Sequence, residues 1–536
     1  MTTTVEPEAP EAPEPRPRDL SVRELARWIW RQLTSMRTAL LLLLLTALAA
    51  VPGSLIPQEG VDSLKTSRWQ DQHPTLTPIY DRLGLFDVYS SAWFSAIYLL
   101  LMISLVGCIV PRLGVYWRAL RAAPPSAPRR LDRLPAHASY TSEQSVEEVL
   151  DRARGVLRGR RYRLADGDGA VSAEKGHLRE AGNLVFHLAL LVVLAGFGLG
   201  SLYGYKGGAI IVVGDGFSNT LTSYDDLAPG RLFDPDVMEP FTFTVDDFSA
   251  QWLYTGPRAG MAQKFEAPLT YRTEPGAQEE HYDLRVNHPL SIGGTDIFLI
   301  GHGYAPVITV TDGDGNVAAS GPRPFLPTDG RTFRSFGVVK AANASPTQIG
   351  LQGELYPTYA FDHDHGPYST FGEALDPFIS MTVWTGDLGL SNGTPQSVYA
   401  LDTAQMTMLK KDDGAPFRVD LRPGESVELP DGLGKVSFDG LQPWVRVQIS
   451  RQPGIHLALG GVIAALLGLL GSLFIRPRRL WVRARTGEGG TLVEVGGLDR
   501  TEGGDPADEV AAIVAALRGE PAPDRPGDPQ REEPEA

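Results

Sequence analysis

Two histidines lie within or beside long apolar segments, where an ionisable side chain is costly. His187 is five residues into the segment 182–203, and His456 is the second residue of the segment 455–475. An ionisable residue inside a membrane generally marks a functional site. A neutral imidazole there is suited to ligating haem iron, or it hydrogen-bonds to a neighbouring helix for about 0.6–2 kcal/mol. Both interpretations are open from the residues alone.

The two histidines differ too much in height to ligate the same iron. At about 1.5 Å per residue, His187 lies about 8 Å from one edge of the membrane, and His456 lies at the opposite edge. Across a hydrocarbon layer of ~30 Å their heights differ by roughly 20 Å. Each histidine would therefore need its own haem or a second ligand from a partner.

The last apolar segment carries small residues at every fourth position after His456: Gly460, Ala464, Gly468 and Ser472. This spacing places them on one face of a helix, and small residues let another helix, or a flat ligand, approach the backbone closely. We expect helix packing on this face, with a ligand surface as the alternative.

The other motifs do not predict catalysis. His363 and His365 alternate with acidic residues in FDHDHGPY, and without further ligands we expect an acidic surface loop there and not a metal site. The sequence contains no nucleophile elbow, no Walker motif and no HExxH,. We therefore assign no catalytic residue and no metal ligand, and enzymatic activity of this chain is left open.

His187 and His456 must be positioned by membrane helices. Four apolar segments contain no Asp, Glu, Lys or Arg: 38–56, 93–110, 182–203 and 455–475. Each is long enough to cross the ~30 Å hydrocarbon layer as a helix. The sequence therefore predicts a polytopic α-helical membrane protein with four transmembrane helices.

Arginine placement predicts the orientation of these helices. Arginine clusters precede the first segment and follow the second and the fourth. Because positive residues concentrate on the cytoplasmic side, we expect both termini to be cytoplasmic and residues 204–454 to be extracytoplasmic. The stretch 204–450 carries 16 Lys and Arg against 31 Asp and Glu, so the acidic excess of the chain lies in this one region.

The regions between the spans differ in pattern. Alternating apolar residues between turn signals, as in FTFTV and KVSFDG, predict a large β-rich domain over 204–454, a sandwich or an open barrel with one core or two β-units,. Amphipathic patterns predict a small cytoplasmic α+β region over 111–181, to which the tail adds a strand and a helix. The remaining expected parts are a disordered N-terminus (1–19), a basic cytoplasmic segment (20–37), an external loop (57–92) and a partly disordered cytoplasmic tail (476–536).

Composition excludes several classes of function. The net charge of −15 argues against a nucleic-acid partner,. The single cysteine, Cys108, excludes a disulfide-built fold, a CxxC redox pair and a CxxCH haem-attachment site within this chain,.

Six blocks of sequence, in order, resemble the ResB (CcsB) family of system II cytochrome c biogenesis proteins. They contain GSLIPQ at the end of the first span, the YSSAWF start of the second span and GYKG after the third span. They also contain KGHLREAGNLVFHLALLVVLAG around His187, VNHPLSIGGTDIFLIGHGYAP in the external region, and QPGIHLALGG leading to the basic exit of the last span. The resemblance covers about residues 25–485.

The resemblance implies a role in haem delivery. Proteins of this family pair with a CcsA/ResC-type membrane partner that carries a tryptophan-rich haem-handling loop, and the complex delivers haem outward for attachment to apocytochrome c. This chain lacks the tryptophan-rich motif, as expected of the ResB half alone, and would be an accessory subunit of that complex. A thioredoxin-like partner would reduce the cytochrome thiols.

The resemblance also suggests site residues. His187 resembles the membrane histidine of the family, which implies non-covalent haem binding, and His456 is a second candidate. Asn287, His288, Pro289 and His302 lie in the external block, and we expect this segment to contact the partner or apocytochrome c. The alternative is a structural hairpin in which Pro289 fixes the start of a strand. For the whole chain, the alternative function is a membrane-anchored scaffold or envelope-assembly protein that binds no haem.

Overall fold

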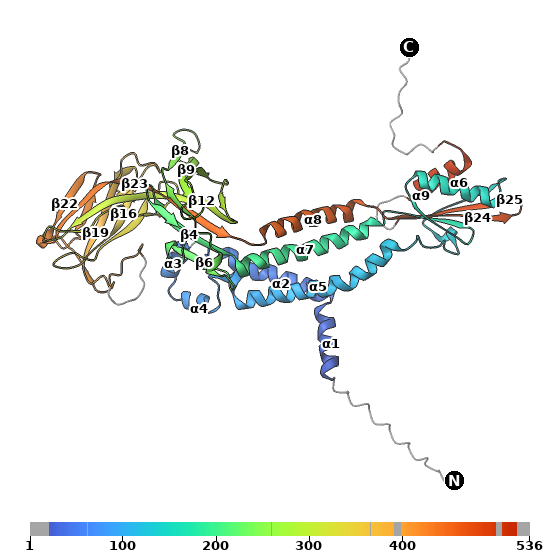
Figure 1. Cartoon of the computed structure of the whole chain (residues 1–536), viewed down its shortest axis with the longest axis horizontal. Helices are drawn as coiled ribbons and strands as arrows, with labels where there is room; N and C mark the ends of the chain where they lie inside the picture. Colours follow the sequence, from blue (N-terminus) through green and yellow to red (C-terminus); the bar gives the residue numbers. More distant parts are fainter. Residues whose placement is uncertain are drawn as a thin grey trace, which may run out of the picture. The chain divides into compact units, whose positions relative to one another are not determined.

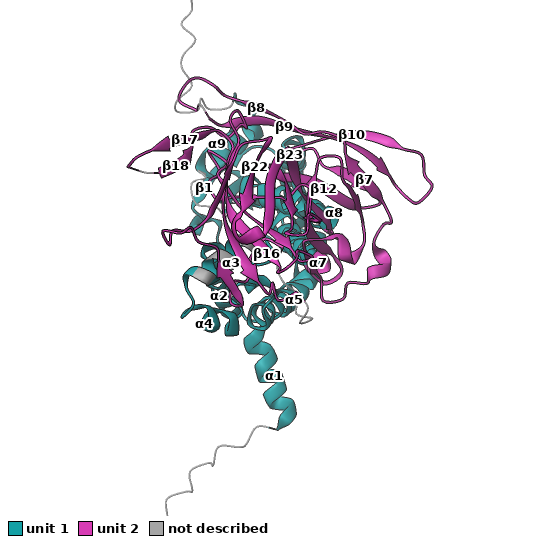
Figure 2. Cartoon of the chain, turned by 90° about the vertical axis from the view of Figure 1, so that its left-hand side faces the viewer, with its two compact units in different colours: residues 1–197, 455–536 teal, residues 198–454 magenta. Residues whose placement is uncertain are grey.

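The computed structural model describes residues 21–61, 63–258, 260–364, 366–390, 398–499 and 506–521. His365 and the two ends predicted to be disordered, 1–19 and most of 519–536, lie outside the described residues. The chain divides into two compact units, Met1–Phe197 with Ile455–Ala536 and Gly198–Gly454 (Figure 2).

In the described part of the chain, four helices are long and apolar enough to cross a membrane (Figure 1). They are α2 (Met36–Leu55), α5 (Ala92–Arg121), α7 (Leu178–Tyr203) and α8 (Ile455–Phe474). Runs of leucine, alanine and valine favour helix, and the side chains of Ser35 and Ser91 cap the first turns of α2 and α5,. The predicted fold class of four transmembrane helices with a large β-rich region is confirmed.

Shorter helices flank the first two spans. They are α1 (Val22–Leu33), α3 (Ser63–Gln72), α4 (Thr77–Arg82) and the 3-10 helix η1 (Val88–Ser90). The end of α1 is fixed to α5, because Ser104 Oγ donates to the Leu33 carbonyl at 2.6 Å and Cys108 Sγ donates to the Thr34 carbonyl at 2.8 Å. Cys108 thus has a packing role in the helical unit.

Two distant segments of the chain build one α+β region. Its sheet has the order β1-β25-β24-β3-β2, with β1 (Ala136–Ser142), β2 (Arg163–Gly167), β3 (Ala170–Lys175), β24 (Arg478–Gly487) and β25 (Gly490–Asp499). It is accompanied by the helices α6 (Val146–Gly159) and α9 (Pro506–Arg518) and by η2 (Leu131–Arg133). Val149, Leu157, Val482 and Ile513 are buried between the sheet and the two helices. The expected joining of the loop with the tail is therefore present.

The second unit is almost entirely β-structure. One sheet contains β11 (Leu290–Ile292), β12 (Thr295–Thr311), β23 (Gly434–Arg451), β4 (Tyr205–Val212) and β6 (Asp226–Pro229), with β13 (Val317–Ala319) and β22 (Glu425–Leu429) at its margins. A second contains β10 (Glu280–Arg285), β9 (Ala262–Arg272), β7 (Thr242–Val245), β5 (Gly216–Ser218) and β8 (Ser249–Trp252). A third contains β14 (Leu326–Pro327), β15 (Ser335–Ala341), β16 (Ile349–Tyr356), β19 (Phe378–Gly386), β20 (Met406–Met408) and β21 (Arg418–Leu421).

Outside these sheets, β17 (Tyr359–Asp362) pairs with β18 (Gly366–Ser369), and the 3-10 helices are η3 (Leu221–Ser223), η4 (Pro235–Val237) and η5 (Pro430–Gly432).

This unit has two hydrophobic cores, which share the long strands β12 and β23. Ile297 and Val447 belong to one core, whereas Ile308 and Phe438 belong to the other. The two strands pair antiparallel from Thr295–Arg451 to Thr311–Lys435, with register shifts after Leu299 and after Val307. The stretch of β12 between these shifts lies between the two cores, and it contains His302.

Candidate functional site

His187 presents a free imidazole nitrogen on α7. Its Nδ1 lies 2.8 Å from the backbone carbonyl oxygen of Asn183, one turn earlier. A carbonyl oxygen only accepts, so Nδ1 carries a hydrogen and donates it, and Nε2 is the nitrogen left for another contact. Within the described part of the chain Nε2 has no hydrogen-bond partner. The bond to Asn183 is the orienting contact that a histidine ligand of a metal ordinarily shows.

The other contacts of α7 show which side of the helix carries this ring. Small residues of α8 meet Gly182, Phe186, Ala189 and Val193, whereas His187 is rotated from their mean direction by roughly 130°. Leu194 lies seven residues after His187 and so on nearly the same face, and its carbonyl accepts a hydrogen bond of 2.5 Å from Tyr98 Oη of α5. His187 therefore lies on the side of α7 that α5 approaches, away from α8.

His456 is exposed at the start of α8. The buried positions of this helix are Ala458, Gly461, Ala465 and Gly468, and His456 points roughly opposite to them. Gly461 lies against Ala189 and Val193. From this register, His456 is level with about residue 196 and stands about 14 Å along the axis from His187. Within this chain the two rings do not converge on one ligand.

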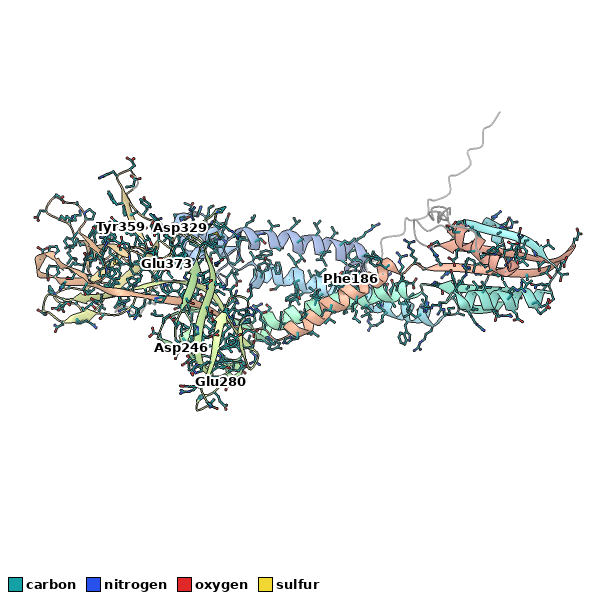
Figure 3. All side chains as sticks on the ribbon, turned by 90° about the horizontal axis from the view of Figure 1, so that it is seen from above. Phe186, Asp246, Glu280, Asp329, Tyr359 and Glu373 are labelled. Carbon is teal, nitrogen blue, oxygen red and sulfur yellow. The ribbon has the colours of Figure 1, made fainter. Side chains whose placement is uncertain are left out.

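Close packing of α7 on α8 involves part of the predicted stripe of small residues. A Cβ at Gly468 would lie 2.5 Å from the Phe186 backbone nitrogen, and one at Gly461 would lie 3.0 Å from the Val193 nitrogen. Figure 3 shows Phe186 where these two helices run side by side. Gly460, by contrast, has nothing within 4 Å. Within this chain the packed face follows spacings of three and four, and Gly468 contacts α7 as expected. A contact of Gly460 with a helix of a partner stays a prediction.

Asn287, His288 and Pro289 form an exposed turn between β10 and β11. Asn287 has φ of +63°, a left-handed conformation that asparagine tolerates better than most residues. The His288 amide donates to the Arg285 carbonyl at 3.0 Å, and Tyr282 Oη donates to the Pro289 carbonyl at 2.9 Å. These bonds fix the backbone, while the side chain of His288 is exposed to solvent.

His302 lies in a different environment, a box of aromatic rings. Its ring stacks on Phe333 and Phe248 at centroid distances of 4.5 and 4.9 Å, with Phe265 at 5.1 Å and Trp252 at 6.2 Å. The residue is 9% exposed, and its buried Nε2 has no hydrogen-bond partner among the described residues. Burial lowers the pKa of His302 to about 4, because an apolar environment disfavours the charged ring.

The structure thus separates the residues suggested by the sequence. His288 is available to a partner protein, whereas His302 supports the domain from within, so any effect of His302 on a partner is indirect. The aromatic box was missed by sequence reasoning, because Phe248, Trp252, Phe265 and Phe333 are far apart in the chain and share no motif. Among the described residues, no group of three or more His, Cys, Asp or Glu side chains is placed to bind a metal ion.

Four membrane-spanning helices, a β-rich unit with two cores and an α+β region built from two segments define a distinct class of polytopic membrane protein. The chain belongs to the ResB-like family, whose model matches residues 36–511. The resemblance stated from the sequence blocks is thereby confirmed.

Similar proteins from bacteria carry names that refer to one process. The chain is 28% identical to "Cytochrome c biogenesis protein CcsB" of Synechococcus sp. (strain WH7803) over 397 residues, 72% of this chain and 83% of that protein. It is 29% identical to the CcsB protein of Synechococcus elongatus over 473 residues, 86% of this chain and 87% of that protein. It is 21% identical to "Cytochrome c biogenesis protein ResB" of Bacillus subtilis over 492 residues, 86% and 82% of the two chains.

Proposed function

We propose that this protein acts in cytochrome c maturation and holds haem, as cargo, within the membrane through His187. The names of the relatives support the process. The observation that carries the haem assignment is the free Nε2 of His187, whose ring is oriented by the Asn183 carbonyl. An imidazole that is oriented through Nδ1 and keeps Nε2 available fits an axial ligand of haem iron.

A partner must supply the rest of the haem site. His456 is about 14 Å away along the helix axis and points to another side, so it does not complete a site with His187. The proposal therefore includes a CcsA/ResC-type membrane protein that contributes the second ligand and performs the attachment to apocytochrome c. His456, exposed at the start of α8, is the weaker candidate for a second haem contact with that partner.

The proposed topology places both termini in the cytoplasm and residues 204–454 outside. The exposed turn Asn287–Pro289 then faces the compartment where apocytochrome c is matured, and we propose that it contacts the apocytochrome or the partner. Because Cys108 is the only cysteine and is bonded to Thr34 in the helical unit, thiol reduction falls to a separate thioredoxin-like protein.

The test is the haem content of the full chain purified together with its partner. His187→Gly is expected to reduce bound haem or shift its Soret band and to lower holocytochrome c. Added imidazole should restore part of both, because it fills the space of the lost ring and supplies the same nitrogen ligand. Leu188→Ala, which changes the neighbouring exposed residue on α7, is the matched control and should leave the spectrum unchanged.

One result would contradict the haem assignment. If the His187→Gly complex keeps full haem, an unaltered Soret band and normal cytochrome c maturation, His187 is satisfied by Asn183 alone. A complex without any haem band, isolated in an active state, would instead support the alternative of a scaffold that binds no haem.

A further inference from the structure

A basic pocket of about 510 Å³ lies where the α+β region joins α7 and α8. Strand β3 leads into α7 through Gly176 and His177, and α8 leads into β24 through residues 475–477. Figure 1 shows α7, α8 and β24 in this part of the chain. β3 and β24 pair directly, with Lys175 opposite Arg478. The pocket is therefore bounded by two membrane-spanning helices and by the sheet that continues from them.

The pocket walls carry an excess of positive charge. Five cationic side chains line it: Arg161, Arg163, Lys175, Arg476 and Arg478. Arg163 pairs with Glu174 at 2.7 Å, and Arg478 pairs with Asp499 and Glu509 at 3.4 and 3.1 Å. Within the described residues the other three have no carboxylate partner. Lys175 Nζ donates to the Arg160 carbonyl at 3.3 Å and lies 5.6 Å from the centroid of the Tyr162 ring. Arg161 and Arg476 therefore carry most of the charge that is left for a ligand.

The same pocket has an apolar rim. Phe474, the last residue of α8, is 77% exposed, and Leu178, the first residue of α7, is 53% exposed; both line the pocket. Residues at the ends of transmembrane helices lie at the border of the hydrocarbon layer. The positive end of the α7 dipole and the negative end of the α8 dipole meet at this border and offset each other, so the side-chain cations carry the charge of the pocket,. A ligand here therefore meets cations on one side and acyl chains on the other.

A close contact between two backbone segments forms this pocket before any ligand is bound. Gly176 has φ of +78°, and a Cβ at this position would lie 2.1 Å from the Arg476 carbonyl oxygen. The two connecting segments thus touch backbone to backbone, and only glycine permits that approach. This contact holds Lys175 and Arg476 near each other before any ligand is bound.

We propose that this pocket binds the phosphate headgroup of an anionic phospholipid from the adjacent leaflet. The proposed topology makes that leaflet cytoplasmic, but the binding itself does not depend on haem. A free phosphate shares the charge but not the acyl chains, so it gains nothing from the exposed Phe474 and Leu178. A lipid bound here ties the α+β region to the membrane surface at the point where α7 and α8 enter it.

The experiment measures lipid binding to the full chain in detergent by native mass spectrometry. The probes are phosphatidylglycerol and phosphatidylcholine with identical acyl chains, and inorganic phosphate alone. The wild-type protein is expected to retain phosphatidylglycerol selectively. The double variant Arg161→Gln with Arg476→Gln should bind it about tenfold more weakly, because two nearby cations are lost.

Two sets of variants distinguish lipid binding in the pocket from general attraction of the lipid to positive charge. Arg118→Gln with Arg121→Gln removes two charges from the last turn of α5, outside the pocket, and should leave binding unchanged. Arg161→Lys with Arg476→Lys keeps the charges and should bind within about threefold of the wild type. Equal binding of both lipids, an equal loss in the α5 control pair, or occupancy by inorganic phosphate alone at matching concentration would each overturn the proposal.

Discussion

At the scale of single residues, the buried imidazole of His302 couples the stability of the β-rich unit to pH. Its pKa is lowered to about 4 by burial, against about 6.5 in an unfolded chain. Between these values the unfolded state binds the proton more readily, so this contribution to stability is complete above pH 6.5, falls as the pH drops from 6.5 to 4, and levels off below pH 4. The loss is about 3 kcal/mol at the acidic end.

This dependence can be measured on the full chain in detergent, as the thermal midpoint between pH 7 and pH 4. His302→Phe keeps an aromatic ring in the box but does not titrate, so its midpoint should fall less on acidification than that of the wild type. His281→Phe, at an exposed histidine of β10, should behave as the wild type. If the thermal midpoints of the wild type and of His302→Phe fell in parallel with pH, protonation of His302 would not contribute to the pH dependence of stability.

The turn Asn287–Pro289 carries the residue-scale prediction for partner binding. His288→Ala should lower holocytochrome c about fivefold, the effect of losing about 1 kcal/mol at a protein interface. Holocytochrome c is measured by haem staining in cells that make equal amounts of this protein. His281→Ala, at an exposed histidine of β10 outside the turn, is the control and should leave holocytochrome c unchanged. Normal maturation in His288→Ala would leave this turn with a structural role only.

At the scale of elements, the packing of α7 on α8 depends on glycine at one position. Gly468→Leu would force side-chain atoms into the backbone of Phe186, because even a Cβ would lie 2.5 Å from its nitrogen. We expect a loss of about 1–3 kcal/mol, seen as a lower thermal midpoint and a lower yield of the purified protein. Gly460→Leu, on the open side of the same helix, should keep both near wild-type values. Equal behaviour of the two variants would argue against close packing of these helices.

The elements also show what a sequence can predict. The amphipathic pattern of SVEEVLDRARGVLRG belongs to the α+β region predicted over 111–181, and the helix α6 spans Val146–Gly159 there. Such a pattern is readable because helical period and capping are local. The pairing of Ala136 with Gly497 joins residues that are hundreds of positions apart, and no local pattern specifies it. The aromatic box of His302 and the basic pocket depend on pairings of this kind. Sequence reasoning therefore identified the histidines as notable but not their surroundings.

At the scale of the whole molecule, the arginine clusters set the expected orientation. Arg37 lies in the first turn of α2 and Arg118 in the last turn of α5, and Arg476 follows α8. Placing all of them in the cytoplasm satisfies the preference of positive residues for that side, and it requires residues 204–454 to be outside. With four spans, both termini then share the cytoplasmic side.

Reporter fusions test this orientation. Alkaline phosphatase folds only outside the cytoplasm, because it needs an oxidising compartment for its disulfides. A fusion after residue 300, within β12, should therefore be active, whereas a fusion after residue 150, within α6, should be inactive. A cytoplasmic reporter such as green fluorescent protein at the same two positions is the matched control and should give the reciprocal pattern. If the phosphatase were active after residue 150 and inactive after residue 300, the basic pocket would face the outer leaflet and the turn at His288 could not meet apocytochrome c.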